Sequence, residues 1–177
     1  MNSISQPIRY LSISLLLACA GLAWAHGGAT GIVKERMDAM SSLSESVKKL
    51  TPIMRGRTDY NAVTVQQEAE KIAKLGGSHL TEMFPEGSLT DSSEAKPAIW
   101  QQWSKFATYA DELTLLADGL AAAAVNSKAR QDGVAATGGS KQTLTVEQLA
   151  KMPTADVFRL VTKSCAGCHK AFRSKKN

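Results

Sequence analysis

The sequence predicts an all-α fold, an antiparallel four-helix bundle. Apolar residues recur at helical spacing in four stretches of the chain, and segments rich in glycine, proline and small polar residues separate these stretches. We find no convincing run in which polar and apolar residues alternate, so the pattern does not favour β-strands. Four helices joined by short or medium loops are typical of a bundle whose neighbouring helices run in opposite directions.

The start of the chain has the pattern of a secretory signal peptide. Arg9 supplies a basic region, residues 11–22 are mostly apolar, and Ala23-Trp24-Ala25 is a cleavage site of the small-x-small type. We therefore expect residues 1–25 to be removed and residues 26–177 to form a single domain in the periplasm.

An alternative for this segment is a lipoprotein signal, because residues 16–19 loosely resemble a box that would place a lipid on Cys19. The apolar run continues past Cys19, which favours the ordinary signal peptide. The run is too short to span a membrane comfortably, and no later segment is apolar for long enough, so we expect no membrane span.

Two helices are predicted in the first half of the chain. The first runs from about residue 30 to residue 49 or beyond, because apolar residues recur there every three or four positions. The second begins after Asp59, a plausible N-cap, and ends near residue 75 or 80, where two glycines weaken it.

Two further helices are predicted in the second half. The third runs from about Ser93 to Val125, with four aromatic residues assigned to the core: Trp100, Trp103, Phe106 and Tyr109. A loop at residues 126–143 follows. A short helical lead-in at Thr145, interrupted by Pro153, then precedes the last helix, which ends near Arg173.

The last predicted helix carries a C-x-x-C-H motif formed by Cys165, Cys168 and His169, which is typical of c-type haem attachment. Residues three and four positions apart share a helical face, so both thiols and the imidazole would point to one side. The thiols can then add to two vinyl groups of a porphyrin while the imidazole reaches the iron. We therefore predict one covalently attached haem c, with His169 as an iron ligand.

Other uses of this motif fit the sequence less well. A redox disulfide is expected near a βαβ pattern, which the chain lacks. Structural zinc needs four Cys or His ligands, and only His26 and His79 remain beyond the motif. The net charge is +5, or +4 after loss of Arg9 (20 basic minus 16 acidic residues), which gives no indication of nucleic-acid binding.

With these features the chain resembles the class II cytochromes c, the family of cytochrome c prime and its low-spin relatives. Three stretches carry the resemblance: residues 36–40, residues 96–106 and residues 165–173. A haem motif near the C-terminal end, with Arg173 four residues after His169, is more specific than the motif alone.

The resemblance implies roles for residues outside the motif. The family's first-helix arginine lies near a haem propionate, and Arg36 matches it. The residue four positions later, Met40, would face the distal side of the iron, and Arg173 would lie beside the proximal imidazole. We expect Met40 to be the second axial ligand, with Met37 as a less favoured candidate, although some family members have a distal methionine that does not bind the iron.

Two functions follow from the resemblance. An iron bound by His169 and Met40 would make the protein a periplasmic electron carrier and not an enzyme. A five-coordinate iron in an apolar distal pocket would instead bind nitric oxide or another small gas. Peroxidase-like turnover is least favoured, because the first predicted helix carries no histidine for a distal acid–base pair.

The charges near the end of the chain indicate what kind of redox partner the protein would bind. Asp156 is the only acid from residue 153 onward, whereas six residues are basic: Arg159, Lys163, Lys170, Arg173, Lys175 and Lys176. A haem edge ringed by such residues would attract an acidic redox protein. A homodimer is implied by the resemblance alone.

Overall fold

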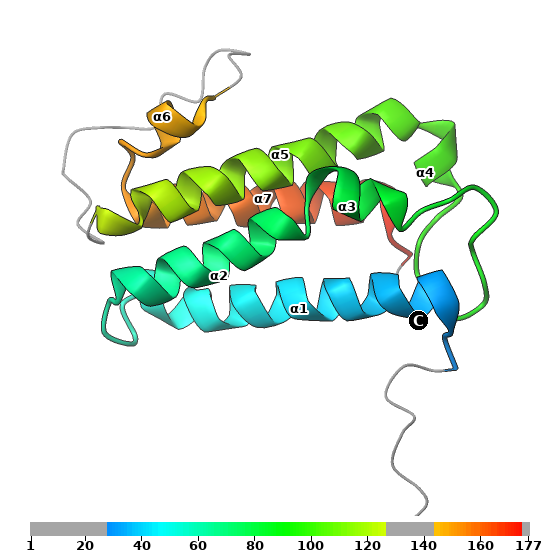
Figure 1. Cartoon of the computed structure of the whole chain (residues 1–177), viewed down its shortest axis with the longest axis horizontal. Helices are drawn as coiled ribbons and strands as arrows, with labels where there is room; N and C mark the ends of the chain where they lie inside the picture. Colours follow the sequence, from blue (N-terminus) through cyan, green and yellow to red (C-terminus); the bar gives the residue numbers. More distant parts are fainter. Residues whose placement is uncertain (1–27, 127–143, 175–177) are drawn as a thin grey trace, which may run out of the picture.

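The computed structural model describes residues 28–126 and 144–174 and confirms the predicted four-helix bundle. Four long helices run antiparallel to their sequence neighbours (Figure 1): α1 (Gly31–Met54), α2 (Ala62–Lys74), α5 (Trp103–Ala122) and α7 (Thr154–Phe172). Four short segments complete them: α3 (Gly77–Glu82), α4 (Ala98–Gln101), the 3-10 helix η1 (Ala123–Val125) and α6 (Val146–Leu149). The predicted signal peptide and nearly all of the predicted loop at residues 126–143 lie outside the described residues.

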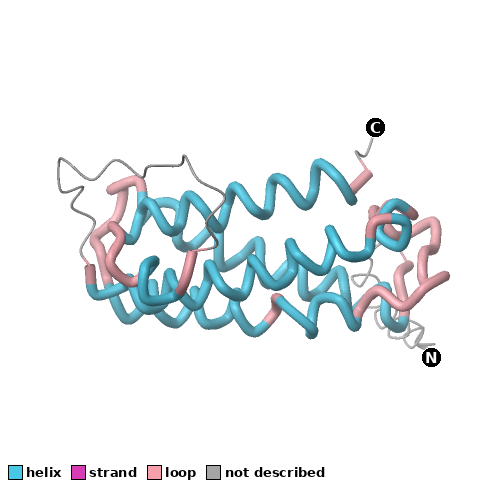
Figure 2. Tube along the Cα trace, turned by 90° about the horizontal axis from the view of Figure 1, so that it is seen from above, coloured by secondary structure: helices cyan, strands magenta, loops and turns pink. Residues whose placement is uncertain are grey.

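Segments far apart in sequence meet at one end of the bundle. α1 begins there, α7 ends there, and α3 and α4 lie beside them (Figure 1). Seen from above, the helix that leads to the C-terminal end runs along one edge of the molecule (Figure 2). The residues with predicted roles on α1 and α7 therefore lie at the same end of the bundle.

The second predicted helix begins later than expected and is divided in two. Asn61, not Asp59, is the N-cap of α2, and its side-chain oxygen accepts a hydrogen bond from the backbone N–H of Thr64 (2.9 Å). α2 and α3 are separated near Gly76. A Cβ at Gly76 would collide with Thr114, so the glycine permits close contact with α5 at this point.

The third predicted helix also begins later than expected. Residues 93–97 are not helical, because this segment pairs with the end of α7: the backbone N–H of Lys96 donates to the carbonyl oxygen of Phe172 (2.8 Å). α4 follows, and the helix is interrupted at Gln102 before α5 begins. Tertiary pairing has replaced the first helical turns that the periodicity predicted.

The last helix begins where the sequence predicted it, with Pro153 directly before the first residue of α7. The predicted lead-in is α6. It opens with a capping box, in which Oγ1 of Thr145 accepts a hydrogen bond from the backbone N–H of Gln148 (3.3 Å) and Oε1 of Gln148 accepts one from the backbone N–H of Thr145 (2.8 Å).

α6 is fixed to the bundle on two sides. Leu149 is fully buried against Gly119 of α5, where a Cβ would overlap the leucine side chain. Nδ2 of Asn126 donates hydrogen bonds to the carbonyl oxygens of Ala150 (2.6 Å) and Met152 (3.0 Å). The chain therefore enters α7 from a fixed position.

The core consists of two clusters of buried apolar residues. The larger cluster draws on α1, α2, α5, α6 and α7, and its largest fully buried side chains are Leu50, Val65, Ile72, Leu120, Leu149, Val157 and Val161. The smaller cluster contains Ala39, Leu80, Met83, Phe84, Ile99, Phe106, Ala110 and Phe172. Met40 and Leu75 are only partly buried and pack against both clusters, so they mark the junction between them.

A buried carboxylate joins α1 to α2. Glu68 of α2 accepts hydrogen bonds from Ser46 (2.8 Å) and Lys49 (2.6 Å) of α1 and from Lys71 (2.9 Å) of its own helix. Burial by itself would raise the pKa of Glu68, but the hydrogen bonds from Lys49, Lys71 and Ser46 outweigh it and lower the pKa to about 2.

A Glu68→Gln variant is expected to lose on the order of 2 kcal/mol of unfolding free energy at neutral pH. Because the folded-state pKa lies below the ordinary value of 4.5, the stabilisation is present above pH 4.5 and is lost as the pH falls toward 2. Urea unfolding at pH 7 and pH 3 measures this, and the difference from the unmodified protein should narrow at pH 3. An equal difference at both pH values would contradict the prediction. Glu70→Gln, an exposed site on the same helix, is the control.

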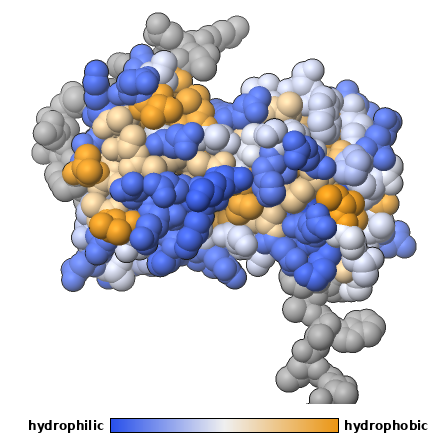
Figure 3. Space-filling view, in the orientation of Figure 1, coloured by the Kyte–Doolittle hydropathy of each residue, from blue (hydrophilic) through white to orange (hydrophobic). Residues whose placement is uncertain are grey.

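The surface gives no sign of a membrane-spanning element in the described part of the chain. None of the helices there is both long and apolar enough to cross a bilayer. The face in Figure 3 is largely hydrophilic and shows apolar residues in several places. Large apolar residues with substantial exposure are Val63, Trp103 and Val125.

Candidate haem site

The C-x-x-C-H motif lies in the last two turns of α7. Cys165 and Cys168 are partly buried and form no disulfide, whereas His169 is exposed. Cys165 packs against the larger core cluster and Cys168 against the smaller one. Both thiols therefore contact the core near the junction of the two clusters.

Burial sets the protonation states of these groups. It raises the pKa of the Cys165 thiol, and together with the neighbouring Cys165 it raises the pKa of Cys168 to about 11. Although much of the His169 residue is exposed, partial desolvation of its ring lowers its pKa; the charge of Arg173 lowers it further, and the charge of Glu94 opposes this. Before a haem is attached, these shifts favour protonated thiols and a neutral imidazole at neutral pH, the form in which a histidine nitrogen can bind a metal.

Met40 and Met37 differ in what they contact. Met40 packs against both core clusters, whereas Met37 is partly exposed and packs against neither. α1 packs mainly against α2, and α7 mainly against α5, so α1 and α7 contact each other much less. Of these two methionines, Met40 is therefore the one packed toward the interior. Its predicted bond to iron stays a prediction.

Arg36 is buried and binds the loop between α3 and α4. Nε and Nη2 donate to the carbonyl oxygen of Met83 (3.1 and 2.8 Å), Nη2 to Oγ of Ser88 (2.7 Å) and Nη1 to Oγ of Ser93 (3.2 Å). The guanidinium also lies 4.0 Å from the ring centroid of Phe84. Burial lowers the pKa of Arg36. These four hydrogen bonds engage most of its five N–H groups, and the predicted propionate contact stays a prediction.

Arg173 caps the C-terminal end of α7 and is tied to the same loop. Its backbone N–H donates to the carbonyl oxygen of His169 (3.0 Å). Its Nε and Nη2 lie 2.6 and 2.5 Å from Oε2 of Glu94. The charges of Arg173 and Glu94 both act on His169. Arg173 therefore acts on the motif histidine through its charge, and its predicted place beside an iron-bound imidazole stays a prediction.

Comparison with known proteins decides the family. Residues 31–143, more than half of the chain, match the family described as Cytochrome C'. The chain belongs to the cytochrome c′ family. Cytochromes c-556 from Agrobacterium fabrum and from Agrobacterium tumefaciens strain II Chrys are 28% and 30% identical to it, over 89% and 82% of this chain and 88% and 99% of the relatives.

Solved cytochrome c′ structures share the fold. Those from Shewanella frigidimarina and Thermochromatium tepidum have a TM-score of 0.60 at 22% and 20% identity, and the similarity covers 81% of this chain and 94% and 95% of those chains. Like its cytochrome relatives, this chain carries a covalently bound haem c.

The residues of α7 and α1 fit such a group. Two reduced thiols, three positions apart, lie on a helix beside the junction of two core clusters. Cys165, Cys168 and Met40 are only partly buried there, although Val161 and Phe172 on α7 are almost completely buried. The bound haem supplies an iron that changes between ferric and ferrous states. Cys165 and Cys168 would hold its porphyrin through thioether bonds.

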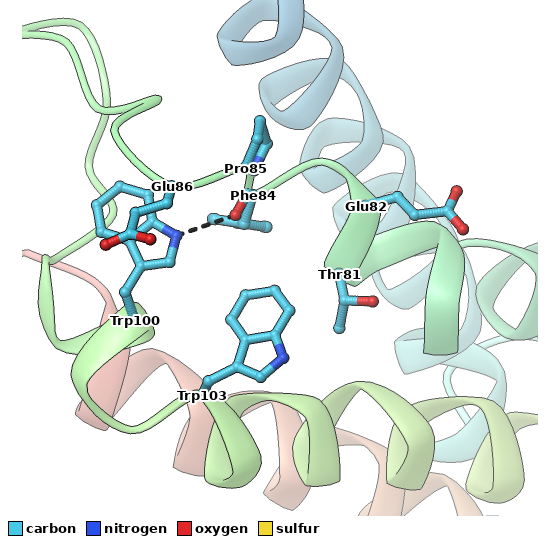
Figure 4. A pocket seen from close by; sticks show the side chains of 7 residues that line it. All are labelled: Thr81, Glu82, Phe84, Pro85, Glu86, Trp100 and Trp103. Atoms are coloured by element: carbon cyan, nitrogen blue, oxygen red, sulfur yellow. Dashed lines mark hydrogen bonds between the residues drawn. The ribbon is translucent and has the colours of Figure 1, made fainter.

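An open hollow at the same end of the bundle does not involve these residues. It lies between the α3–α4 loop and the start of α5, and the side chains that line it are Thr81, Glu82, Phe84, Pro85, Glu86, Trp100 and Trp103 (Figure 4). Trp103 is the first residue of α5 and its side chain lines the hollow, so it is 40% exposed. Its predicted place in the core is therefore wrong. Phe106 is buried as predicted, while Trp100 and Tyr109 are partly buried.

Sequence reasoning missed the loop that holds both arginines. Ser88, Ser93 and Glu94 bind Arg36 or Arg173 across 52 to 79 positions of the chain, so no local spacing reveals these contacts. The one available signal was position: Glu94 lies two residues before the stretch 96–106, which already carried the family resemblance.

Proposed function

We propose that this cytochrome c′ family member is a periplasmic electron carrier, not an enzyme, with His169 and Met40 as the axial ligands of its haem iron. The observation that carries the proposal is the position of Met40. It is the α1 residue that packs against both core clusters, and the two thiols of α7 pack against the same two clusters. A thioether in this place can reach the distal side of an iron whose proximal side is bound by His169.

The physical consequence is an iron with two protein ligands. A His/Met pair gives a low-spin iron and raises its reduction potential, which suits transfer of single electrons. No substrate is transformed in this reaction. The protein positions the haem and adjusts its potential through ligands, burial and neighbouring charges.

The second candidate is a five-coordinate protein that binds nitric oxide or another small gas. A variant of cytochrome c prime from Alcaligenes xylosoxidans, 22% identical to this chain, has been solved as a nitric oxide complex. That function requires an open distal position. Binding of nitric oxide by the unmodified protein, together with a high-spin ferric spectrum, would support this candidate and contradict ligation by Met40.

Met40→Ala is expected to convert a low-spin ferric protein into a high-spin one, because the only proposed distal ligand is removed. The far-red methionine-to-iron charge-transfer band should disappear from the absorption spectrum. Met37→Ala is the matched control, since Met37 lies one turn away on the same helix outside both core clusters, and it should leave the spectrum unchanged. An unchanged spectrum for Met40→Ala would show that Met40 is not a ligand.

The charges of α7 refine the proposed redox partner. Arg159 pairs with Asp156 (2.6 Å) and Arg173 pairs with Glu94, so both cations already have an anionic partner within the chain. Lys163 and Lys170 are exposed and form no ion pair with the described residues. We expect an acidic partner to exchange electrons more slowly as ionic strength rises from 10 to 200 mM, measured by stopped-flow kinetics. A rate independent of salt would contradict docking of an acidic partner through these lysines.

A homodimer is part of the same proposal and rests on the family alone.

A further inference from the structure

The loop between α3 and α4, residues 83–97, joins the first helix of the bundle to the last. Ser93 accepts a hydrogen bond from Arg36 of α1, and the next residue, Glu94, accepts hydrogen bonds from Arg173 at the end of α7. Both arginines that the family resemblance singled out are thus held by two adjacent residues. One loop therefore holds one charged side chain of α1 and another at the end of α7.

The contact with α7 extends along the backbone on either side of the ion pair. The N–H of Ser174 donates to the carbonyl oxygen of Glu94 (2.7 Å), and the N–H of Lys96 donates to that of Phe172 (2.8 Å). Ala95 and Arg173 form the β-bridge between these two hydrogen bonds. The backbone of residues 94–96 is therefore fixed against residues 172–174 independently of the Glu94 carboxylate.

We propose that Glu94 is a positioning residue that holds the Arg173 guanidinium beside His169 and thereby sets the reduction potential of the haem iron. This inference rests on the part of the proposed function that makes His169 a ligand, and not on ligation by Met40. Glu94 is not one of the proposed ligands. Its own charge acts on His169 in the direction opposite to that of Arg173, so the proposed role is to position Arg173 and not to supply charge.

The geometry explains why a carboxylate is needed at this place. Nε and Nη2 of Arg173 both lie on a single oxygen of Glu94, which fixes the plane of the guanidinium as well as its distance. The Arg173 side chain is 53% exposed, so without this partner it would extend into water, where its charge is screened. A cation held close to the axial imidazole favours the ferrous state, because reduction removes one positive charge from the iron.

A simpler account treats the pair as an ordinary surface ion pair, which contributes little to stability. The two accounts differ in one measurable way. Independent charges shift a reduction potential by amounts that add. If Glu94 positions Arg173, the effect of removing Arg173 depends on whether Glu94 is present.

The test is a double-mutant cycle on the haem-loaded protein, with the reduction potential measured by spectroelectrochemistry. Arg173→Gln is expected to lower the potential when Glu94 is present, and to lower it much less in a Glu94→Gln background. Glu86→Gln, an acidic residue of the same loop in the hollow of Figure 4, is the matched control for loss of charge. Its combination with Arg173→Gln should be additive. The same Arg173→Gln shift in both Glu94 backgrounds would overturn the proposal.

Two further measurements keep the result unambiguous. Arg173→Lys keeps the charge but cannot place two nitrogens on one oxygen, so the reduction potential of this variant should lie below that of the unmodified protein. An equal potential would overturn the proposal. This measurement remains available even if the Glu94→Gln protein fails to accumulate. Thermal unfolding of each variant separates a general loss of stability from a change in potential. A high-spin spectrum of the unmodified protein would refute ligation by Met40 but leave this cycle valid, because His169 remains the proposed proximal ligand.

Discussion

A chain that carries both Cys165→Ala and Cys168→Ala is expected to contain no covalently attached haem. The two thiols are the reduced cysteines of the described structure, and each packs against a different core cluster at the candidate site. Alanine offers no sulfur for a thioether bond, so neither vinyl group of the porphyrin can be joined to α7. Intact mass spectrometry of the exported product should give the mass of the polypeptide alone, and a haem stain after denaturing electrophoresis should be negative.

The third cysteine of the sequence provides the control. Cys19→Ala removes a thiol from the predicted signal peptide and should leave haem attachment complete. Persistence of the haem mass in the Cys165/Cys168 double variant would refute the assignment of the attachment site. Single variants should retain at most one thioether bond, which the position of the α-band in the pyridine haemochrome spectrum can distinguish from two.

Phe106→Ala is expected to lower the unfolding free energy by about 3–5 kcal/mol, the range for truncation of a large buried aromatic side chain. Phe106 is 2% exposed and lies at the centre of the smaller core cluster. Its ring centroid is 4.8 Å from that of Phe84, 5.6 Å from that of Trp103 and 5.6 Å from that of Phe172. The substitution therefore removes three ring contacts and leaves a cavity beside the end of α7.

Chemical denaturation of haem-loaded samples in one oxidation state measures this loss. Trp103→Ala is the matched control, because Trp103 is a larger aromatic residue that contacts the same ring but is 40% exposed. Its loss of stability should be clearly smaller. Equal losses for the two variants would mean that burial around Phe106 does not determine the stability of this end of the bundle.

The helices could be predicted where local periodicity and tertiary contacts agree. α7 follows its predicted bounds almost to the residue, and α1 begins where predicted but continues to Met54, past the expected end near residue 49. The capping box of α6 can be read directly from Thr145 and Gln148. The prediction failed at residues 93–97, which the sequence assigns to the first turn of the third helix but which pair with the end of α7. A local pattern cannot report a contact with a segment more than seventy residues away.

In the candidate site, too, the local features could be predicted from the sequence and the long-range contacts could not. The motif of Cys165, Cys168 and His169 is local, so the sequence alone indicates its chemistry. The role of Arg36 depends on distant partners: Met83 and Ser93 are 47 and 57 positions away. Resemblance to a family could name this arginine, but only the folded structure identifies the groups that bind it.

The tight contact between Leu149 and Gly119 also determines how freely this sequence can vary. α6 has only four residues, yet it reaches α5 at a position where no side chain larger than hydrogen fits beneath Leu149. The chain therefore re-enters the bundle at one fixed point. A larger residue at Gly119 would displace α6, and with it the start of α7 and the placement of its two thiols.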